Sequence, residues 1–414
     1  MSVGVVGAGI SGLHLALRLQ QAGVPVTLYA ERSAEEIADG RPQNLVVRFG
    51  HTRERERALD VEHWTAPEHS MFGAHVFAPG EPPLRFFGAL SEPGSAVDFR
   101  IYLPRLMADF EERGGAVDPV VADVESVVEL AERHDLVVVA SGRRSITDLF
   151  PRDASRSPFG EPQRILTAGL YHGIAPMETT ALHFNLCPGV GEVFSIRMLT
   201  FGGPVHGMNI EAIPGGPLEA LVHMDYQADP AGFERAVLTL LAEHAPALRE
   251  RIDEREFGPA RPVDLLQGGI TPTVRAGWTV LPNGKYCMAV GDAWITNDPV
   301  AGQGANLGSH SAFTLADEII AGPPYDEAFC RRAEQRRWEY ARPVTEWSNA
   351  FLLPPPPHAL EVLGRAGADQ RIADAFIDNF NDPPAMWRVL GSPEGAAAWL
   401  ATFGQPASSV GAPG

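Results

Sequence analysis

The chain has 414 residues, of which 45% are hydrophobic and 21% charged, enough apolar material for a buried core in two or three domains. Its 33 Lys and Arg against 52 Asp and Glu give a net charge of −19, which argues against nucleic acid and anionic membranes as partners. Three widely spaced cysteines and no apolar run of about 18 residues predict a cytoplasmic protein with no disulfide scaffold, no zinc cluster and no membrane span.

The first element is a βαβ unit. Residues 3–31 predict a short buried strand, a Gly-rich turn, an amphipathic helix and a second strand at 26–29. Parallel strands joined in this way predict an α/β sheet covered by helices. The region that follows is harder to divide, with strands expected at 73–79, 84–90, 116–119 and 136–140 and helices at 51–60 and 102–113.

The middle of the chain changes character. Residues 160–260 alternate short apolar runs with Gly and Pro turns, which is typical of a mostly antiparallel sheet. Strands are expected there at 181–186, 193–199, 208–213 and 220–226, with a helix at 230–244. After residue 261 a strand at 286–290 and a helix at 312–321 follow, and the pattern is helical from 325 on, broken at 354–357 and ending in a frayed tail.

The turn of the βαβ unit reads GxGxxG and opens a helix. Gly7 permits the tight turn, Gly9 leaves room for a pyrophosphate, and Gly12 lets the helix pack closely on the strand. An acid at the end of the second strand is expected to hold ribose hydroxyls, which gives a dinucleotide site rather than a Gly-rich turn without a ligand. The residues assigned to this site are Gly7, Gly9, Ile10, Ser11, Gly12, Glu31 and Arg32.

A second Gly-rich segment lies at 286–310, where a buried strand leads through a Gly-Asp pair to GQG and a helix. An acid at a strand end suits a ribityl hydroxyl, and a Gly-rich helix start suits the electron-rich edge of a reduced isoalloxazine. Two such helix starts suit one extended ligand; a second nucleotide site and a structural loop are the alternatives. The assigned residues are Gly291, Asp292, Pro299, Gly302, Gln303, Gly304, Ala305 and Asn306.

These two segments and DLVVVASGRRS (135–145) resemble the three signatures of flavoprotein monooxygenases with the aromatic-hydroxylase fold. Five further stretches resemble the oxygenase component of styrene and indole monooxygenases: ALDVEHW (58–64), AVDFRIYLPRLM (96–107), DLLQGGITP (264–272), DPVAGQGAN (298–306) and DNFNDPPAMW (378–387). The resemblance implies an α/β protein with a Rossmann-like FAD-binding domain, a mainly antiparallel substrate domain and a helical C-terminal region. The expected division is 1–45, 96–155 and 261–325 for FAD, 46–95 and 156–260 for substrate, and 326–414 for the helical region with its frayed tail.

The resemblance also implies a two-component enzyme. A separate NADH-dependent reductase supplies diffusible reduced FAD, which forms a C4a-hydroperoxide with O2 and epoxidises a small apolar aromatic alkene or the C=C bond of indole. Since only one βαβ fingerprint is present, the chain offers no obvious second Rossmann domain for NADH. A single-component NAD(P)H-dependent aromatic hydroxylase and a non-catalytic FAD-binding redox protein remain alternatives. No metal is expected, and a homodimer is the expected oligomer.

The resemblance further implies pocket residues in the loop after Glu31. Asn44 matches an Asn of the family and is the candidate catalytic residue, a donor to the reacting oxygen, with a turn-capping Asn as the alternative; Val46 matches an apolar wall residue. The other pocket candidates, mixed between the styrene and indole types, are Arg48, Met71, Phe72, Ala74 and Gly94. A solvated position is the favoured interpretation of Arg48 and of the charged run at 53–57, and ordinary core is the alternative for the Met and the Phe.

Overall fold

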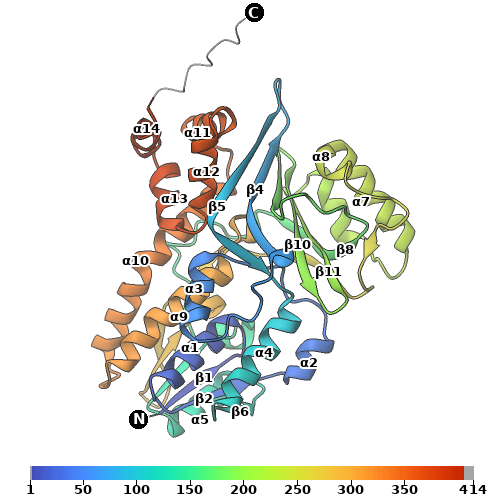
Figure 1. Ribbon diagram of the computed structural model, residues 1–414. Coiled ribbons are helices and arrows are strands. Elements are labelled where there is room, and N and C mark those ends of the chain that lie inside the picture. Colours follow the sequence, from blue (N-terminus) through green and yellow to red (C-terminus); the bar gives the residue numbers. More distant parts are fainter. Residues whose placement is uncertain (1, 405–414) are drawn as a thin grey trace, which may run out of the picture.

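The strands of the computed structural model, which describes residues 2–404, form two large sheets, one above the other in Figure 1. The first sheet has the order β15-β16-β7-β1-β2-β6, and every neighbouring pair is parallel except β15 with β16. The predicted parallel sheet is therefore confirmed. Its strands are β1 (Val3–Val6), β2 (Val26–Ala30), β6 (Ala116–Pro119), β7 (Leu136–Val139), β15 (Trp278–Val280) and β16 (Tyr286–Ala289).

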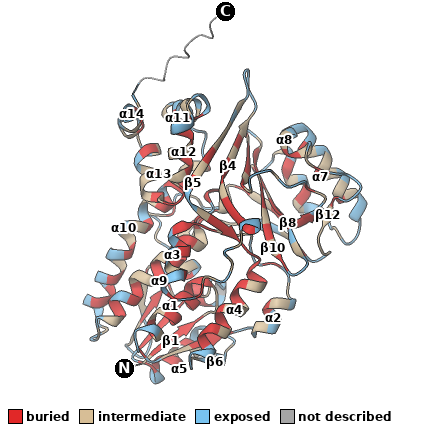
Figure 2. Ribbon diagram, viewed as in Figure 1, coloured by how far each residue is buried: buried red, intermediate tan, exposed pale blue. Residues whose placement is uncertain are grey.

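Helices cover this sheet, and helix α1 shows why. Its leucines at 13, 15, 17 and 19 are all fully buried, because α1 (Ile10–Gln21) lies between the sheet, α4 (Phe99–Glu112) and α9 (Gly304–Ile320). Figure 2 shows the resulting layer of buried residues around β1, α1 and α9. The other helices of this part are α2 (Ala34–Asp39), α3 (Gly50–Ala58), α5 (Val124–Arg133) and α6 (Arg144–Thr147).

The second sheet is mostly antiparallel, as predicted, with the order β12-β8-β11-β10-β9-β4-β5-β3 and β13 added on β8; only the pair β4 with β9 is parallel. Its apolar residues form two further cores, one on each side of the sheet. Its strands are β3 (Val47–Arg48), β4 (Ser70–Ala78), β5 (Leu84–Ala96), β8 (Ile165–His172), β9 (Leu182–Cys187), β10 (Gly191–Thr200), β11 (Gly203–Ala212), β12 (Gly258–Pro259) and β13 (Leu265–Gly269).

Helices cover this sheet as well. The predicted helix at 230–244 is confirmed as α7 (Pro230–His244), followed by α8 (Pro246–Arg249). The strand predicted at 220–226 is wrong. That segment belongs to a 3-10 helix (Pro217–His223), because Pro217 starts a helical turn and the i, i+3 pair Leu218 and Leu221 buries against the sheet.

The C-terminal part is helical, as predicted, and breaks at the proline run between α10 (Glu327–Phe351) and α11 (Pro357–Ala368). Helices α11 and α12 pack on β5, so this part closes the second sheet. The predicted frayed tail lies outside the described residues. The remaining elements are α12 (Gln370–Asp378), α13 (Pro383–Leu390), α14 (Pro393–Ala401), the strand pair β14 (Thr273–Val274) and β17 (Ile295–Thr296), and the 3-10 turns Pro67–His69, Gly291–Ala293 and Pro299–Ala301.

Most strands of the first sheet lie in the segments assigned to the FAD-binding domain, and most strands of the second sheet lie in the segments assigned to the substrate domain. Strand β13 is different: it lies within the segment 261–325 assigned to the FAD-binding domain, yet it pairs with β8 of the second sheet. The domain boundaries themselves stay a prediction. No helix within residues 2–404 has the length and apolar character that crossing a bilayer requires.

Candidate active site

A cleft of about 950 Å³ opens between the two sheets, at the carboxyl ends of the parallel strands β1, β2, β7 and β16. This edge of an open α/β sheet is where ligands bind in such folds. We call the turn at 7–12 with the start of α1 the first anchor and the loop at 299–305 with the start of α9 the second anchor, and the two together the floor. Residues of β8, β11 and β13, with Asn297 of the loop before the second anchor, form the roof. The predicted site residues that line the cleft are Gly7, Gly9, Ile10, Ser11, Glu31, Arg32, Asn44, Val46, Asp292, Pro299, Gly302, Gly304 and Ala305.

The first half of the floor is the start of α1. Gly7 has a φ of +117°, the left-handed region that favours glycine, and a Cβ on Gly12 would lie 1.9 Å from the carbonyl oxygen of Gly7. A Cβ on Gly9 would instead meet no protein atom within 4 Å and would project into free space at the helix start. Since α1 has no side-chain cap and no acid in its first turn, its N–H groups are available to an anion such as a pyrophosphate.

The second half of the floor is the start of α9. Gly302 has a φ of +64° and ends the turn after Pro299, and a Cβ on Gly304 would also meet no protein atom. Helix α9 likewise has no side-chain cap and no acid in its first turn. Two uncapped helix starts therefore open into one cleft, which fits a single extended ligand with two electron-rich ends.

The two helix starts are held together at Ser11. A Cβ on Gly291 would lie 2.6 Å from its hydroxyl oxygen, and a Cβ on Gly308 would lie 2.3 Å from it. Gly291 thus lets the 3-10 turn after β16 pack closely on α1, and Gly308 does the same for α9. Gly142 has a similar task at the end of β7, because a Cβ there would lie 2.7 Å from the Cβ of Asp292.

Two of the predicted cofactor residues brace the loop instead of lining the cleft. Gln303 is buried and donates through Nε2 to the carbonyl oxygen of Phe380 at 3.2 Å. Asn306 accepts from the backbone N–H of Phe49 at 3.0 Å and donates to the carbonyl oxygens of Val47 and Gly302, each at 3.0 Å. Their side chains shape the second anchor, and their contact with the cofactor stays a prediction.

Positive charge collects at the cleft in this acidic protein. Arg32, Arg41 and Arg143 line it, and Arg143 forms an ion pair with Glu31 at the end of β2. Cationic side chains beside the first anchor favour an anionic ligand. Of these, Arg143 and Arg41 were not assigned from the sequence, although Arg143 lies in the quoted stretch 135–145.

The loop after α2 carries Asn44 and Val46 into the cleft, where Asn44 is solvent-exposed. The start of this loop is held in place, because Arg100 donates to the carbonyl oxygen of Gly40 at 3.2 Å. Arg100 itself is buried and forms ion pairs with Asp98 and Asp264. An exposed amide on a held loop can donate a hydrogen bond to a bound group. The catalytic role of Asn44 stays a prediction.

The solvated interpretation of Arg48 is wrong. Its side chain is 1% exposed, forms an ion pair with Glu56 and donates to Ser95 Oγ at 2.9 Å. The solvated interpretation of residues 53–57 holds for the exposed Glu54 and Arg57 and is wrong for Arg53 and Glu56, which lie three residues apart on the buried face of α3. Alternating charges along the sequence do not place all charges on one face of a helix.

Glu56 continues this buried network to both helices of the floor. Tyr102 donates to Glu56 at 2.7 Å, and the ring nitrogens of His14 contact Tyr102 OH at 2.9 Å and Ser309 Oγ at 2.8 Å. Burial lowers the pKa of His14 to about 3, so this ring is neutral. The network joins α1, α3, α4 and α9 behind the floor.

The other pocket candidates do not line the cleft. Met71 and Ala74 are buried in the core beside the second sheet, and Phe72 is partly buried with its N–H bonded to Thr180. A Cβ on Gly94 would lie 2.9 Å from Val47, so this glycine permits close packing of β3 on β5. Their contact with substrate stays a prediction.

The residues that line the roof were not predicted from the sequence. Leu166 and Ala168 of β8, Asn209 of β11 and Leu266 of β13 line the cleft there, together with Asn297 of the loop before the second anchor. Asn297 lies in the quoted segment 286–310, and Leu266 lies in the quoted DLLQGGITP, but a strand pattern does not show which residue faces a ligand.

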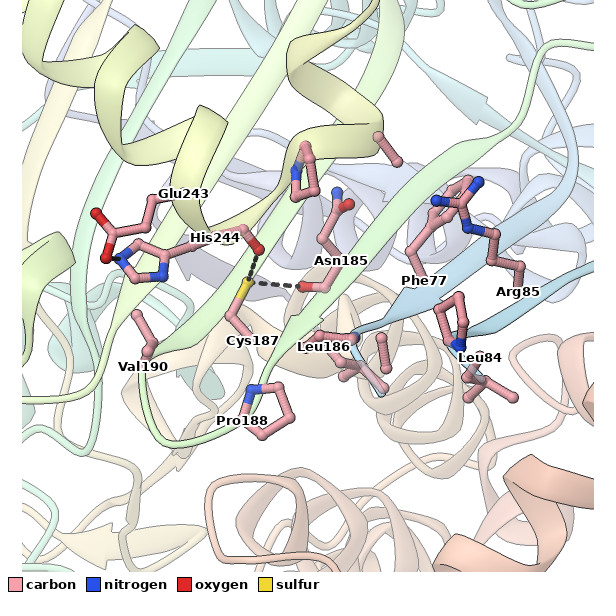
Figure 3. Close-up of a pocket in the computed structure, with 15 residues that line it drawn as sticks. Phe77, Leu84, Arg85, Asn185, Leu186, Cys187, Pro188, Val190, Glu243 and His244 are labelled. Atoms are coloured by element: carbon pink, nitrogen blue, oxygen red, sulfur yellow. Dashed lines mark hydrogen bonds and ion pairs between the residues drawn. The ribbon is translucent and has the colours of Figure 1, made fainter. Parts of the chain in front are cut away.

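A second, smaller cavity of about 210 Å³ lies between the end of the β4–β5 hairpin, β9 and the α7–α8 pair (Figure 3). Cys187 lies at its wall, 3.1 Å from the carbonyl oxygen of His244. Burial raises the pKa of this thiol to about 12, so it is not a thiolate nucleophile near neutral pH. The cavity shares no lining residue with the large cleft.

Comparison with known proteins shows which proteins this chain resembles. A family model described as "Styrene monooxygenase A putative substrate binding domain" matches residues 142–251. The styrene monooxygenase StyA of Pseudomonas fluorescens is 40% identical over 402 residues, 96% of this chain and 97% of the relative. A StyA from a Pseudomonas species is 39% identical over 405 residues, 97% of this chain and 98% of the relative.

Two solved structures share the fold. The flavin-dependent brominase Bmp2 has a TM-score of 0.69 at 13% identity, covering 97% of this chain and 99% of that chain. A flavoprotein/dehydrogenase from Cytophaga hutchinsonii has a TM-score of 0.70 at 11% identity, covering 97% and 98%. At such low sequence identities the two structures show the fold alone. They confirm the fold class that the sequence resemblance implied.

Proposed function

This chain belongs to the styrene monooxygenase StyA family, and on that premise we propose the function that its cleft supports best. It is an FAD-dependent monooxygenase, the oxygenase component that receives reduced FAD from a separate NADH-dependent reductase and oxygenates the C=C bond of an apolar aromatic compound. The observation that carries the proposal is the pair of uncapped, glycine-lined helix starts that open into one cleft.

Reduced FAD, when bound, supplies the two electrons with which one atom of O2 enters the carbon–carbon double bond as an epoxide and the other leaves as water. The residues of the chain bind the FAD and orient it in the cleft. The start of α1 and the arginines beside it suit the pyrophosphate, Glu31 suits ribose hydroxyls, and the start of α9 suits the electron-rich end of the ring system.

The remaining walls suit the reaction itself. Val46 and the apolar residues of β8 and β13 exclude water from the reacting end of the cleft, which limits loss of the activated oxygen as hydrogen peroxide. Asn44 also lines the cleft, and its amide N–H is the proposed donor to the reacting oxygen. An alkene attacks an electrophilic oxygen without losing a proton, so no catalytic base is required.

Three details of the proposal go beyond family membership. The single GxGxxG supports delivery of reduced flavin by a partner instead of direct use of NADH. Three buried free cysteines, Cys187, Cys287 and Cys330, are consistent with a cytoplasmic location. A homodimer remains a prediction.

The test supplies chemically reduced FAD, O2 and either styrene or indole to the purified chain, with product analysis for styrene oxide or indigo. Epoxide or indigo supports the proposal. Hydrogen peroxide as the only product across both substrates contradicts it. In a second arm, the chain is mixed anaerobically with FAD and NADH, and rapid bleaching of the flavin contradicts the need for a reductase.

A further inference from the structure

Arg55 of α3 lies behind the second anchor. Its Nη2 donates to the carbonyl oxygen of Asn306 at 3.4 Å and to Thr52 Oγ1 at 3.2 Å, and its Nε donates to Ser309 Oγ at 2.9 Å. Asn306 directly follows Ala305, which lines the cleft, and Ser309 lies further along α9. These hydrogen bonds hold the guanidinium of Arg55 against the beginning of α9, although Arg55 itself does not line the cleft.

The charge of Arg55 has no carboxylate partner among residues 2–404. Its hydrogen bonds all go to neutral oxygens, and it takes part in no ion pair there. Of the two acids next to it in the chain, Glu54 is exposed to solvent and Glu56 is buried in an ion pair with Arg48. Burial lowers the pKa of Arg55, but a guanidinium still keeps its proton near neutral pH. Arg55 therefore contributes a positive charge that its own helix does not neutralise.

The side chains of other helices that surround Arg55 are uncharged. Burial and the charge of Arg55 lower the pKa of both His14 and His310 to about 3, so both rings are neutral. His310 stacks on Tyr340, whose hydroxyl has its pKa raised to about 12 by burial, and the ring of Phe313 lies 5.9 Å from the guanidinium. Because water screens a partly buried charge less than an exposed one, the field of Arg55 extends to the neighbouring helix start.

The beginning of α9 already favours negative charge. The helix has no side-chain cap and no acid in its first turn, so its N–H groups and its dipole face the cleft without compensation. Near neutral pH, reduced FAD carries one more negative charge on its ring system than oxidised FAD does. The arginines beside the first anchor cannot distinguish the two forms, because the pyrophosphate has the same charge in both.

We infer that Arg55, acting through the first turn of α9, makes the second anchor select reduced over oxidised FAD. The inference rests on the proposed function and assigns a residue to one part of it. The N–H groups of α9 bind the electron-rich end of the ring system in either redox state, and the guanidinium behind them adds a full charge that stabilises the reduced state alone.

The first experiment compares the affinities for the two redox states. The unaltered chain and Arg55→Gln are each titrated anaerobically with oxidised FAD and with FAD reduced by dithionite. We expect Arg55→Gln to bind reduced FAD about 10-fold more weakly, the size of one charge acting at short range within a protein, and to bind oxidised FAD with nearly unchanged affinity. The midpoint potential of the bound FAD, measured with redox dyes, is then expected to fall by about 30 mV, the equivalent of 10-fold for two electrons.

Two further variants separate the charge from the hydrogen bonds. Arg55→Lys keeps the charge and loses the fork of donors, so it is expected to retain most of the preference for reduced FAD. Ser309→Asp keeps the guanidinium and gives it a carboxylate partner, so the potential is expected to fall as in Arg55→Gln. Ser309→Asp also decides the question should Arg55→Gln fail to fold, which thermal unfolding without FAD checks.

The matched control is Arg336→Gln. Arg336 of α10 contacts the other end of α9, where it donates to Glu318 at 2.8 Å, and Arg332 donates to the same carboxylate at 2.9 Å. Because Glu318 neutralises this charge far along the helix from the cleft, the potential is expected to stay unchanged.

The outcomes separate this inference from the proposed function. A potential that Arg55→Gln and Ser309→Asp leave unchanged, or an equal loss of affinity for both redox states, overturns the inference alone. A preference that Arg55→Lys loses as completely as Arg55→Gln assigns Arg55 to hydrogen bonding and overturns it as well. An unaltered chain that binds neither form of FAD overturns the proposed function.

Discussion

The floor and the roof of the cleft are built on different principles. The floor offers backbone N–H groups to a ligand. Gly9 and Gly304 leave free space in front of two helix starts, so binding there requires no particular side-chain orientation. The roof acts through side chains, because Asn209 and Asn297 come from a strand and a loop 88 positions apart and meet only in the folded chain. Each half of the floor is therefore a local motif that the sequence shows, whereas the arrangement of the roof depends on the tertiary structure.

The largest expected effect concerns the frame behind the floor. Arg48→Met leaves the carboxylate of Glu56 buried without its cation, and the loss of one partner of a buried ion pair costs about 3–5 kcal/mol. Urea unfolding followed by circular dichroism measures it. Arg331→Met is the control, since Arg331 and its partner Glu327 are largely exposed, and a change of less than about 0.5 kcal/mol is expected there. Equal effects in the two variants contradict the structural role of Arg48.

The next prediction separates two glycines of the floor. Gly9→Leu is expected to weaken FAD binding at least about 100-fold, or about 2.8 kcal/mol, while thermal unfolding without FAD stays unchanged, because its side chain enters only the space meant for the ligand. Gly12→Ala is expected to lower the unfolding temperature even without FAD, because its Cβ meets the carbonyl oxygen of Gly7. Retained FAD affinity in folded Gly9→Leu removes the pyrophosphate from this turn.

Two buried acids behind the roof, Glu211 of β11 and Asp298 of the loop before α9, are expected to make stability depend on pH. An acid whose pKa is raised on folding binds its proton more tightly in the folded chain, so its contribution is complete below its unfolded pKa and is lost as pH rises. For Asp298, with a pKa raised to about 6, stability is lost from about pH 4 upward, and the raised pKa of Glu211 extends the loss to higher pH.

Glu211→Gln removes one of the two acids and leaves an amide that donates to Asp298. Its free energy of unfolding at pH 8 is expected to exceed that of the unaltered chain by about 1–3 kcal/mol, with the difference shrinking toward pH 5. Chemical denaturation at four pH values checks it. A difference that is constant with pH contradicts the raised pKa values of Glu211 and Asp298.

The smallest effect is expected at Asn44, on the loop after α2 that lines the cleft. Asn44→Ala is expected to leave FAD affinity unchanged and to raise the fraction of reduced flavin lost as hydrogen peroxide by about 2- to 10-fold, the range of one hydrogen bond. Peroxide and epoxide are quantified in the same reaction. Unaltered coupling removes Asn44 from the active site.

The same contrast explains how much could be predicted from the sequence. The βαβ unit, the antiparallel middle and the helical end follow from local periodicity, and the floor follows from two motifs whose glycines act where they stand. The burial of Arg48 and Glu56 could not be predicted, since Arg48 of β3 and Glu56 of α3 pair in the interior only when β3, α3 and β5 come together. Nothing in the local sequence indicated that Glu211 and Asp298 are buried acids with raised pKa values, because their burial and their neighbouring charges arise only in the folded chain.

Ser11, lodged between Gly291 and Gly308, has a consequence for altering this enzyme. Any enlargement at these three positions displaces α1 from α9 or from the 3-10 turn after β16, so we expect them to tolerate change only as a set. Libraries aimed at new substrates are therefore better directed to the cleft-facing positions of β8, β11 and β13, which can be exchanged singly while the flavin cradle is kept intact.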